Sequence, residues 1–422
     1  MAIRRLLATT TPCLRKRKQL PQPRVMRKAS TVQFRRRPGW RAPAIISFAT
    51  LVLSGCARKA PQDTFTPEGP AARDITRLAR PVFAISIGMG IFVYALVIFC
   101  IIKFRRKGED HVPKQVHGNT KLELFWGAVP AMMLAGVGVF STAAIIKQHE
   151  EPKNAYNITV VGHQWWWEYH YPQVGQEKLA PKLVTMANPA DVDTAKAEGR
   201  NPKNIGNVVQ EAGKVVVGAN ELHVPAGRNV RLLITSEDVM HNYWVPKLAG
   251  KIYAIPGRIN KLTLNTDAND AGKTIYGQCA EFCGTSHANM RFKVKVDSPA
   301  DFQKWLTEQT APAAAPTSDM AKAGEVLFNG SGGCTACHWV DSSKTNSYEK
   351  DASGAETLKI GPNLSHVGSR KHFAGAIAEL NERNLKAWLR NPQVFKPGSK
   401  MVIRKLNEDE VNKLVAYILS LK

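Results

Sequence analysis

An uncharged run of 22 residues, from Pro81 to Ile102, limits most strongly what this 422-residue chain can fold into. As a helix it is about 33 Å long at 1.5 Å per residue, which matches the hydrocarbon core of a bilayer. Four basic residues follow it within positions 103–107, so the positive-inside rule places that end in the cytoplasm. A second apolar run, from about 124 to 146, has Trp126 near its cytoplasmic edge and completes a transmembrane hairpin with both long flanks outside.

Glu123 lies where the second run enters the membrane. An ionisable group at that depth is a functional candidate by default. An interfacial carboxylate that faces water or the nearby Lys121 explains the residue equally well, so both interpretations stay open at this point.

The formal net charge of +24 suggests a nucleic-acid partner, but its distribution argues against one. Residues 1–55 contain thirteen Lys and Arg and no acidic residue, which leaves +11 for the rest of the chain. The basic residues are therefore concentrated in a leader, where targeting segments carry them. We expect no nucleic-acid partner.

The leader has the features of a bacterial lipoprotein signal. A basic segment, 35–41, precedes a short apolar run, 44–53, which ends in Leu-Ser-Gly before Cys56. The run is too short to span a bilayer, so we predict cleavage before Cys56 and a thioether-linked lipid on it. The alternative is an uncleaved signal anchor followed by a chance cysteine. Residues 1–25 fit no signal peptide, and Met26 is a plausible true start.

A cluster of metal ligands lies within the twelve residues from Cys279 to Met290, which also include Cys283 and His287. This mixture of thiolate, imidazole and thioether donors selects copper over hard cations. A structural zinc site is the competing interpretation, but zinc seldom uses Met and no second Cys pair lies nearby. A further donor, His241, follows a predicted strand upstream.

The region after Pro152 changes to short runs of branched residues separated by turn residues, which is typical of a β-sandwich. A polar segment at about 175–213 interrupts it and predicts a surface insertion of unknown purpose. The predicted strands are 156–161, 214–217, 230–235, 261–264 and 291–296.

The C-terminal region carries a haem attachment motif. Cys334-x-x-Cys337-His338 offers two thiols for the vinyl groups of a c-type haem and an imidazole for its iron. Alone, C-x-x-C also suits a redox or zinc site, but haem is favoured by the exported context and by the position of the motif at the end of a first predicted helix, in a unit of about 100 residues. The segment 396–401 resembles the loop that carries the distal methionine in small cytochromes c, and this resemblance makes Met401 the candidate second iron ligand, with simple core packing as the alternative. A polar insertion covers about 341–358.

The two copper-ligand segments together resemble the copper-A site of subunit II of the haem–copper cytochrome c oxidases. The resemblance covers about residues 75 to 305, and the twelve-residue motif is highly specific. It implies a cupredoxin-like fold and a binuclear copper centre. In that family two Cys bridge both coppers, each copper takes one His, and a Met and the carbonyl of the intervening Glu are weak ligands. The matching residues here are Cys279, Cys283, His241, His287, Met290 and Glu281.

The same resemblance assigns roles to three further groups. Trp165, in a His-Gln-Trp-Trp-Trp block, matches the tryptophan at which electrons enter above the copper pair, although one buried core aromatic is expected in such a strand. Glu123 matches the glutamate associated with a proton-channel entrance in subunit I. The Glu281 side chain matches one that contacts a magnesium site shared with subunit I.

The fold class that follows is multidomain: a two-helix transmembrane hairpin, a cupredoxin-like β-sandwich and an all-α c-type cytochrome domain. The expected segments are the leader 1–55, an exported segment 56–80, the transmembrane hairpin 81–149, the copper-A domain 150–309, a linker 310–318 and the cytochrome c domain 319–422.

The sequence therefore predicts an electron-relay subunit of a respiratory cytochrome c oxidase, similar to the caa type, in a bacterial inner membrane with both metal domains outside. Its expected partners are oxidase subunits I and III, the bilayer, and cytochrome c or a membrane cytochrome complex as electron donor. A nitric-oxide-reducing relative remains an alternative, because the terminal reaction takes place in another polypeptide. A membrane-tethered copper-binding protein is a third, disfavoured by the haem motif and the two spans.

Overall fold

The computed structural model describes residues 60–105, 115, 117–173, 175–178, 180–185, 207–210, 215–344, 349–350, 356–357 and 359–422. All of these residues belong to one compact unit, Arg58–Lys422. The predicted leader and Cys56 lie outside the described residues, and so does much of the two predicted insertions.

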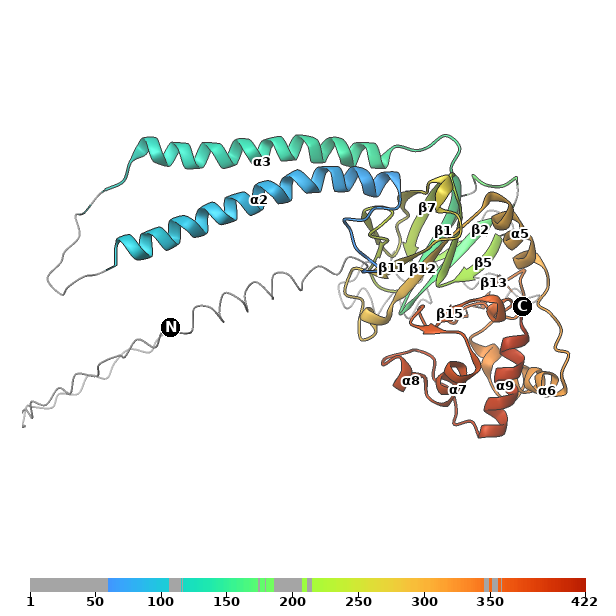
Figure 1. Ribbon diagram of the computed structural model, residues 1–422. Helices are drawn as coiled ribbons and strands as arrows, with labels where there is room; N and C mark the ends of the chain where they lie inside the picture. The colour runs from blue at the N-terminus through green and yellow to red at the C-terminus, as the bar shows by residue number, and fades with distance from the viewer. Residues whose placement is uncertain are drawn as a thin grey trace, which may run out of the picture. The chain divides into compact units, whose positions relative to one another are not determined.

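Two long helices run alongside one another in Figure 1: α2 is Pro70–Lys103 and α3 is Thr120–His149. Both are long and apolar enough to cross a membrane, and their apolar side chains are exposed. They form the hairpin that the hydropathy pattern predicts. Asn119 caps α3 by accepting a hydrogen bond from the amide of Leu122 at 3.2 Å.

Helix α2 begins earlier than the apolar run does, at Pro70 instead of Pro81. Its first turns are charged, so hydropathy alone does not show them. Contacts with the β-domain hold these turns: Arg73 donates to Asp267 at 2.6 Å, and the amide of Ala72 donates to the carbonyl of Leu248 at 3.2 Å. Pro81 therefore lies inside a continuous helix.

The middle of the chain is a β-domain of two five-stranded sheets, ordered β10-β7-β1-β2-β5 and β6-β12-β11-β8-β9. Within the sheets β1 is parallel to β7 and β12 is parallel to β6, while the other neighbours are antiparallel. The strands are β1 Tyr156–His163, β2 Trp166–Pro172, β5 Val215–Ala219, β6 Glu221–Pro225, β7 Asn229–Ser236, β8 His241–Trp244, β9 Lys251–Ala254, β10 Asn260–Asn265, β11 Thr274–Cys279 and β12 Arg291–Asp297.

One buried cluster fills the space between these sheets. Branched residues of the strands, such as Ile158 and Leu232, lie in it beside Trp167, whose ring meets that of Tyr243 edge to face at 5.0 Å. Apolar burial of this extent is the main stabilising term of a sandwich. Helix α5, Pro299–Thr310, closes one margin of the cluster through Phe302. A separate pair, β3 Lys182–Thr185 with β4 Asn207–Gln210, lies within the predicted insertion.

The C-terminal domain is helical and has its own buried core. Helices α6 and α9 pack against each other, with the rings of Phe328 and Tyr417 at 5.4 Å. Its elements are α6 Asp319–Asn329, α7 Glu382–Arg390, α8 Pro392–Phe395 and α9 Glu408–Ser420, with the short strand pairs β13 Glu349–Lys350 and β14 Glu356–Thr357, and β15 His372–Phe373 and β16 Ala378–Glu379. The order hairpin, β-sandwich and helical domain confirms the predicted fold class.

Candidate metal and haem sites

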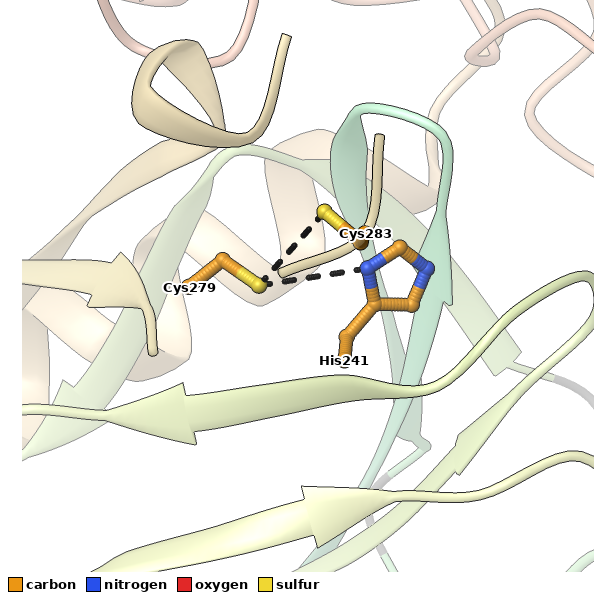
Figure 2. A group of neighbouring side chains, drawn as sticks. All are labelled: His241, Cys279 and Cys283. Carbon is orange, nitrogen blue, oxygen red and sulfur yellow. Dashed lines mark hydrogen bonds between the residues drawn. The ribbon is translucent and has the colours of Figure 1, made fainter. Parts of the chain in front are cut away.

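The first site forms where two chain segments meet at one end of the β-domain. Strand β11 ends at Cys279 and strand β8 begins at His241, and these strands pair so that Cys279 lies opposite Tyr243. The register therefore carries the imidazole, which precedes the thiols by almost forty positions, to their side. Figure 2 shows His241, Cys279 and Cys283 converging.

The ligand atoms that the sequence predicts all lie close together. The Sγ of Cys279 is 3.8 Å from the Sγ of Cys283 and 3.9 Å from Nδ1 of His241. The Sγ of Cys283 is 3.5 Å from Nδ1 of His287 and 3.8 Å from the Sδ of Met290. These spacings bring soft sulfur and imidazole donors around a common centre, a donor set that fits copper.

The backbone carbonyl of Glu281 also points to the cluster, with its oxygen 3.3 Å from the Sγ of Cys279. The two cysteines and Met290 are buried, whereas Phe282 beside them is exposed. A metal held here is therefore screened from water on most sides by protein.

The thiol pair is prepared to lose a proton. A hydrogen bond from the Cys283 thiol lowers the pKa of Cys279, burial opposes this, and the contact with the His241 imidazole adds to the lowering. The same contact raises the pKa of Cys283, because the second proton leaves a site that already holds a thiolate. Metal binding requires both thiolates, so the positive ion has to displace this second proton.

Asp238 orients the imidazole of His241. Its Oδ1 accepts a hydrogen bond from Nε2 at 2.9 Å, which leaves Nδ1 to face the sulfurs. The carboxylate also accepts from the amide of Gln164 at 2.6 Å. Such an outer partner fixes the tautomer and the angle of a metal-binding histidine. The sequence places Asp238 three residues before His241 but does not by itself show this role.

Trp165 lies next to the copper-ligand loop. Its indole N–H donates to the carbonyl of Cys283 at 3.0 Å, and the side chain of Gln164 donates to the same oxygen at 2.8 Å. The loop passes close to the ring at Gly284, where an added Cβ would lie 2.9 Å from the Cζ2 of Trp165. Trp165 is thus buried and bonded directly to the residue that bears a predicted ligand.

The second site is in the helical domain, around the Cys-x-x-Cys-His motif. Nδ1 of His338 donates to the carbonyl of Pro362 at 2.8 Å, so Nε2 is the nitrogen left for iron. Burial lowers the pKa of His338, which keeps the imidazole neutral and able to bind metal. An added Cβ at Gly361 would lie 2.5 Å from Cε1 of His338, so this position has room only for glycine.

The four predicted haem residues line one cavity, which therefore fits a flat apolar group with an iron at its centre. Much of the rest of its wall is apolar. The thioether of Met401 is held by Trp388, whose indole nitrogen lies 3.0 Å from Sδ. The cavity is lined, among other residues, by Cys334, Cys337, His338, Met401, Trp388 and Trp165.

Glu123 lies in the first turn of α3, where its side chain takes part in the helix cap. The carboxylate accepts from the amide of Asn119 at 3.3 Å. Within this chain, Glu123 therefore has a structural role as part of the N-terminal cap of α3.

A buried polar cluster in the β-domain escaped the sequence reasoning. Glu168 and His170 are fully buried and hydrogen-bonded to each other, and Nε2 of His163 lies 3.4 Å from the same carboxylate. Hydrogen bonds and the charges of these histidines lower the pKa of Glu168 against the opposing effect of burial. The only signal in the sequence is charge within an aromatic strand.

Comparisons with known proteins agree with this arrangement. The family model for the transmembrane domain of cytochrome c oxidase subunit II matches residues 62–143, the one for its periplasmic domain matches 156–297, and the cytochrome c model matches 321–422. "Cytochrome c oxidase subunit 2" of Bacillus subtilis is 31% identical over 91% of this chain and 98% of that protein.

The protein of the same name from Alkalihalophilus pseudofirmus is also 31% identical, over 89% of this chain and 96% of that one. A solved structure, the periplasmic domain of subunit II of cytochrome oxidase of Bradyrhizobium japonicum, is 27% identical over 37% of this chain and 95% of that chain, with a TM-score of 0.26. The superposition is too poor to bear on the fold.

The fold and the two sites define a membrane-anchored metalloprotein with a copper-binding domain and a c-type haem domain. The chain belongs to the cytochrome c oxidase subunit II family, in the form that carries a fused C-terminal cytochrome c domain. It is thus a subunit of a haem–copper oxidase complex with an electron-transfer role, anchored by two transmembrane helices that carry a periplasmic domain.

Proposed function

We propose that this chain is the electron relay of its oxidase. Its haem domain accepts electrons from a donor and its copper domain passes them to subunit I, where oxygen is reduced and protons are translocated. One observation carries the proposal: Trp165 lines the haem cavity and also donates to the carbonyl of Cys283. A single side chain therefore touches both sites, and Trp165 is our candidate for the residue at which electrons enter the copper domain.

The copper centre is proposed to be binuclear. The two thiolates would be shared between the metals, with one imidazole for each and two weak outer donors. The contacts of 3.3 to 3.9 Å between the donor atoms support this sharing. The assigned residues are Cys279, Cys283, His241, His287, Met290 and the carbonyl of Glu281.

One covalent c-type haem per chain is proposed for the helical domain, on Cys334, Cys337, His338 and Met401. When bound, the two cofactors supply reversible one-electron chemistry at a potential that the ligands set. The chain's own residues hold these ligands: Pro362 fixes the tautomer of His338, and Asp238 does the same for His241.

The remaining assignments rest on the family to which the chain belongs and on the sequence of its leader. We infer that Glu281 contributes its carboxylate to a magnesium site shared with subunit I, and that Glu123 borders a proton-channel entrance there. We also infer contact with subunit III, a cytochrome c or membrane cytochrome complex as donor, and a bacterial inner membrane with both metal domains outside. A lipid on Cys56 completes the anchoring; an unmodified Cys56 in the mass spectrum of the mature chain would contradict it.

The relay is tested by quantifying copper and iron in the detergent-purified chain and recording its optical and EPR spectra. We expect two coppers with a mixed-valence signal and one covalent haem per chain, with the C279S variant losing the copper signal and keeping the haem. The matched control is C100S, since Cys100 lies in α2 away from both motifs. Haem without the mixed-valence signal in the parent chain would contradict the proposal.

A further inference from the structure

Lys396 is buried in an unusual way for a lysine. It lies on the loop between α8 and Met401, and only 4% of its surface is exposed. Its ammonium group donates to the backbone carbonyl of Trp165 and, at 3.0 Å, to that of Ala374. One acceptor belongs to the β-domain and the other to the helical domain, so this side chain connects the two domains.

Burying such a group is costly unless its hydrogen bonds are satisfied. Burial lowers the pKa of Lys396 to about 7, opposed by the charge of Cys283. Lysines are almost never buried without a partner, and an exposed position would avoid the cost. The buried position therefore indicates a structural role for Lys396, and the contacts of the surrounding residues show that this role is to connect the two domains.

Further hydrogen bonds near Lys396 connect the same two domains. The hydroxyl of Ser286, in the copper-ligand loop, donates to the carbonyl of Pro397, the residue that follows Lys396. The amide of Arg291, directly after Met290, donates to the carbonyl of Gly375 at 3.1 Å. These hydrogen bonds join the copper-ligand loop and the strand that follows it to the haem domain.

Two glycines bring the backbones closer than any other residue would permit. Gly375 and Gly398 have positive φ angles of 79° and 84°. An added Cβ at Gly398 would lie 2.8 Å from the Cβ of Thr285, and one at Gly375 would lie 2.6 Å from the carbonyl oxygen of Asn289. The haem domain thus packs closely on the copper-ligand loop at these two points, where only a residue without a side chain fits.

Two hydrogen bonds to a buried carboxylate hold another part of the same contact. Glu221, buried at the start of β6, accepts from Nδ1 of His372 at 2.8 Å and from the amide of Lys371 at 3.2 Å. At the rim, the ammonium of Lys400 lies 3.5 Å from the carboxylate of Asp238. We call all these contacts between the β-domain and the haem domain the interdomain seam.

We propose that Lys396 is the positioning residue of the interdomain seam, holding the methionine loop of the haem domain on the backbone of Trp165. The two redox domains of one chain then remain docked between turnovers and do not meet by diffusion. This inference rests on the relay proposed above. It adds that Lys396 sets the spacing between the copper site and the haem site.

The step that Lys396 positions moves one electron: the haem domain is oxidised, the copper domain is reduced, and no bond forms or breaks. The rate of such a step falls steeply with the distance between the sites. A side chain that holds Trp165 against the haem loop therefore acts on the rate without touching either metal, as positioning groups do in other reactions.

The test compares K396M with the matched control K405M in the assembled oxidase, because Lys405 is an exposed lysine on the same segment. Met has nearly the length of Lys but no hydrogen-bond donor. K396M therefore leaves the carbonyls of Trp165 and Ala374 without the donor that Lys396 provides. Two quantities are measured: the rate of internal electron transfer after pulsed reduction of the haem, and hydrogen–deuterium exchange of the peptide that contains Arg291.

We expect K396M to slow internal transfer and to speed the exchange, each by about tenfold or more, because two buried hydrogen bonds are lost and each is worth up to about that factor. The haem spectrum, the copper EPR signal and reduction by an external donor stay as in the parent, and K405M matches the parent throughout. Parent-like transfer and exchange in K396M would overturn the proposal.

Two further controls keep the result interpretable. If K396M loses its methionine-ligated haem spectrum, a comparison of K396Q with K405Q decides, because the Gln amide is still a hydrogen-bond donor. An intermediate effect on both measurements supports the proposal, and parent-like values overturn it. If the parent lacks the copper signal, the relay fails, yet the exchange measurement still reports whether Lys396 holds the seam.

Discussion

Asp238 is the carboxylate that determines how the imidazole of His241 faces the two thiols. The hydrogen bond to Nε2 leaves no freedom in the tautomer, because a carboxylate can only accept. Neither residue's identity alone shows this pairing. It depends on the turn that follows β7, in which the hydroxyl of Ser236 donates to the carbonyl of Val239 at 2.6 Å.

We predict that D238N weakens copper binding by about 10- to 100-fold, the range seen when an outer partner of a metal-binding histidine is removed. Asn keeps the shape but loses the charge that stabilises the Nε2–H donor. Competition with a copper chelator measures the affinity. D301N is the control, since Asp301 is an exposed carboxylate in the first turn of α5. An unchanged affinity in D238N would show that the imidazole needs no such partner.

At the scale of elements, the crossing of α6 and α9 determines the shape of the haem domain. Gly324 lies where the helices touch, against the carbonyl of Lys413, and an added Cβ would lie 2.8 Å from the Cβ of Tyr417. A glycine inside a helix normally weakens it relative to alanine. Here the close approach outweighs the helix propensity, because a methyl group has no space between the two backbones.

We therefore predict that G324A destabilises the haem domain by about 1–3 kcal/mol, the usual cost of overpacking. K322A, at an exposed position of α6, is the control and should change the stability by less than about 0.5 kcal/mol. Thermal unfolding followed by the haem absorbance measures both. A gain in stability for G324A would mean that propensity, and not the crossing, dominates at this position.

The first turns of α2 show a different balance at the same scale. Their sequence is charged and lies outside the apolar run, yet the helix continues through Pro81. The Arg73–Asp267 pair and the backbone contact with Leu248 attach it to the β-domain. Tertiary contact, and not hydropathy, thus decides where this helix begins.

For the whole molecule, the interdomain seam joins two domains that each have a separate buried core. Its stability should depend on pH through Lys396, whose pKa burial lowers from 10.5 to about 7. Between these two values the unfolded chain holds one proton more than the folded chain does. Stability therefore rises with pH across this window, by at most about 1.4 kcal/mol per pH unit.

We predict that the thermal midpoint of the parent rises relative to that of K396M between about pH 7 and pH 9, with the largest difference at the higher pH. The groups that face Lys396 are the carbonyls of Trp165 and Ala374, which do not titrate, and Cys283, whose charge acts against the shift. Parallel midpoints for the two proteins over this range would show that Lys396 carries no such proton linkage.

The sequence by itself determined the features that neighbouring residues encode. Apolar runs marked the hairpin, alternation marked the strands, and fixed spacings marked the two ligand motifs. These follow from local rules, because a span, a strand or a Cys-x-x-Cys-His motif needs only its own residues to be recognised. The predicted copper ligands meet in the structure because strand pairing carries His241 to Cys279.

Only the tertiary structure decided what depends on partners far away in the chain. Lys396 and Trp165 are 231 positions apart, so nothing near either residue shows that one will bind the other. The same holds for Arg73 with Asp267 and for Glu221 with His372. Such contacts arise from the packing of whole domains. Burial then changes the behaviour of a residue such as Lys396, which is usually exposed, in a way that composition cannot reveal.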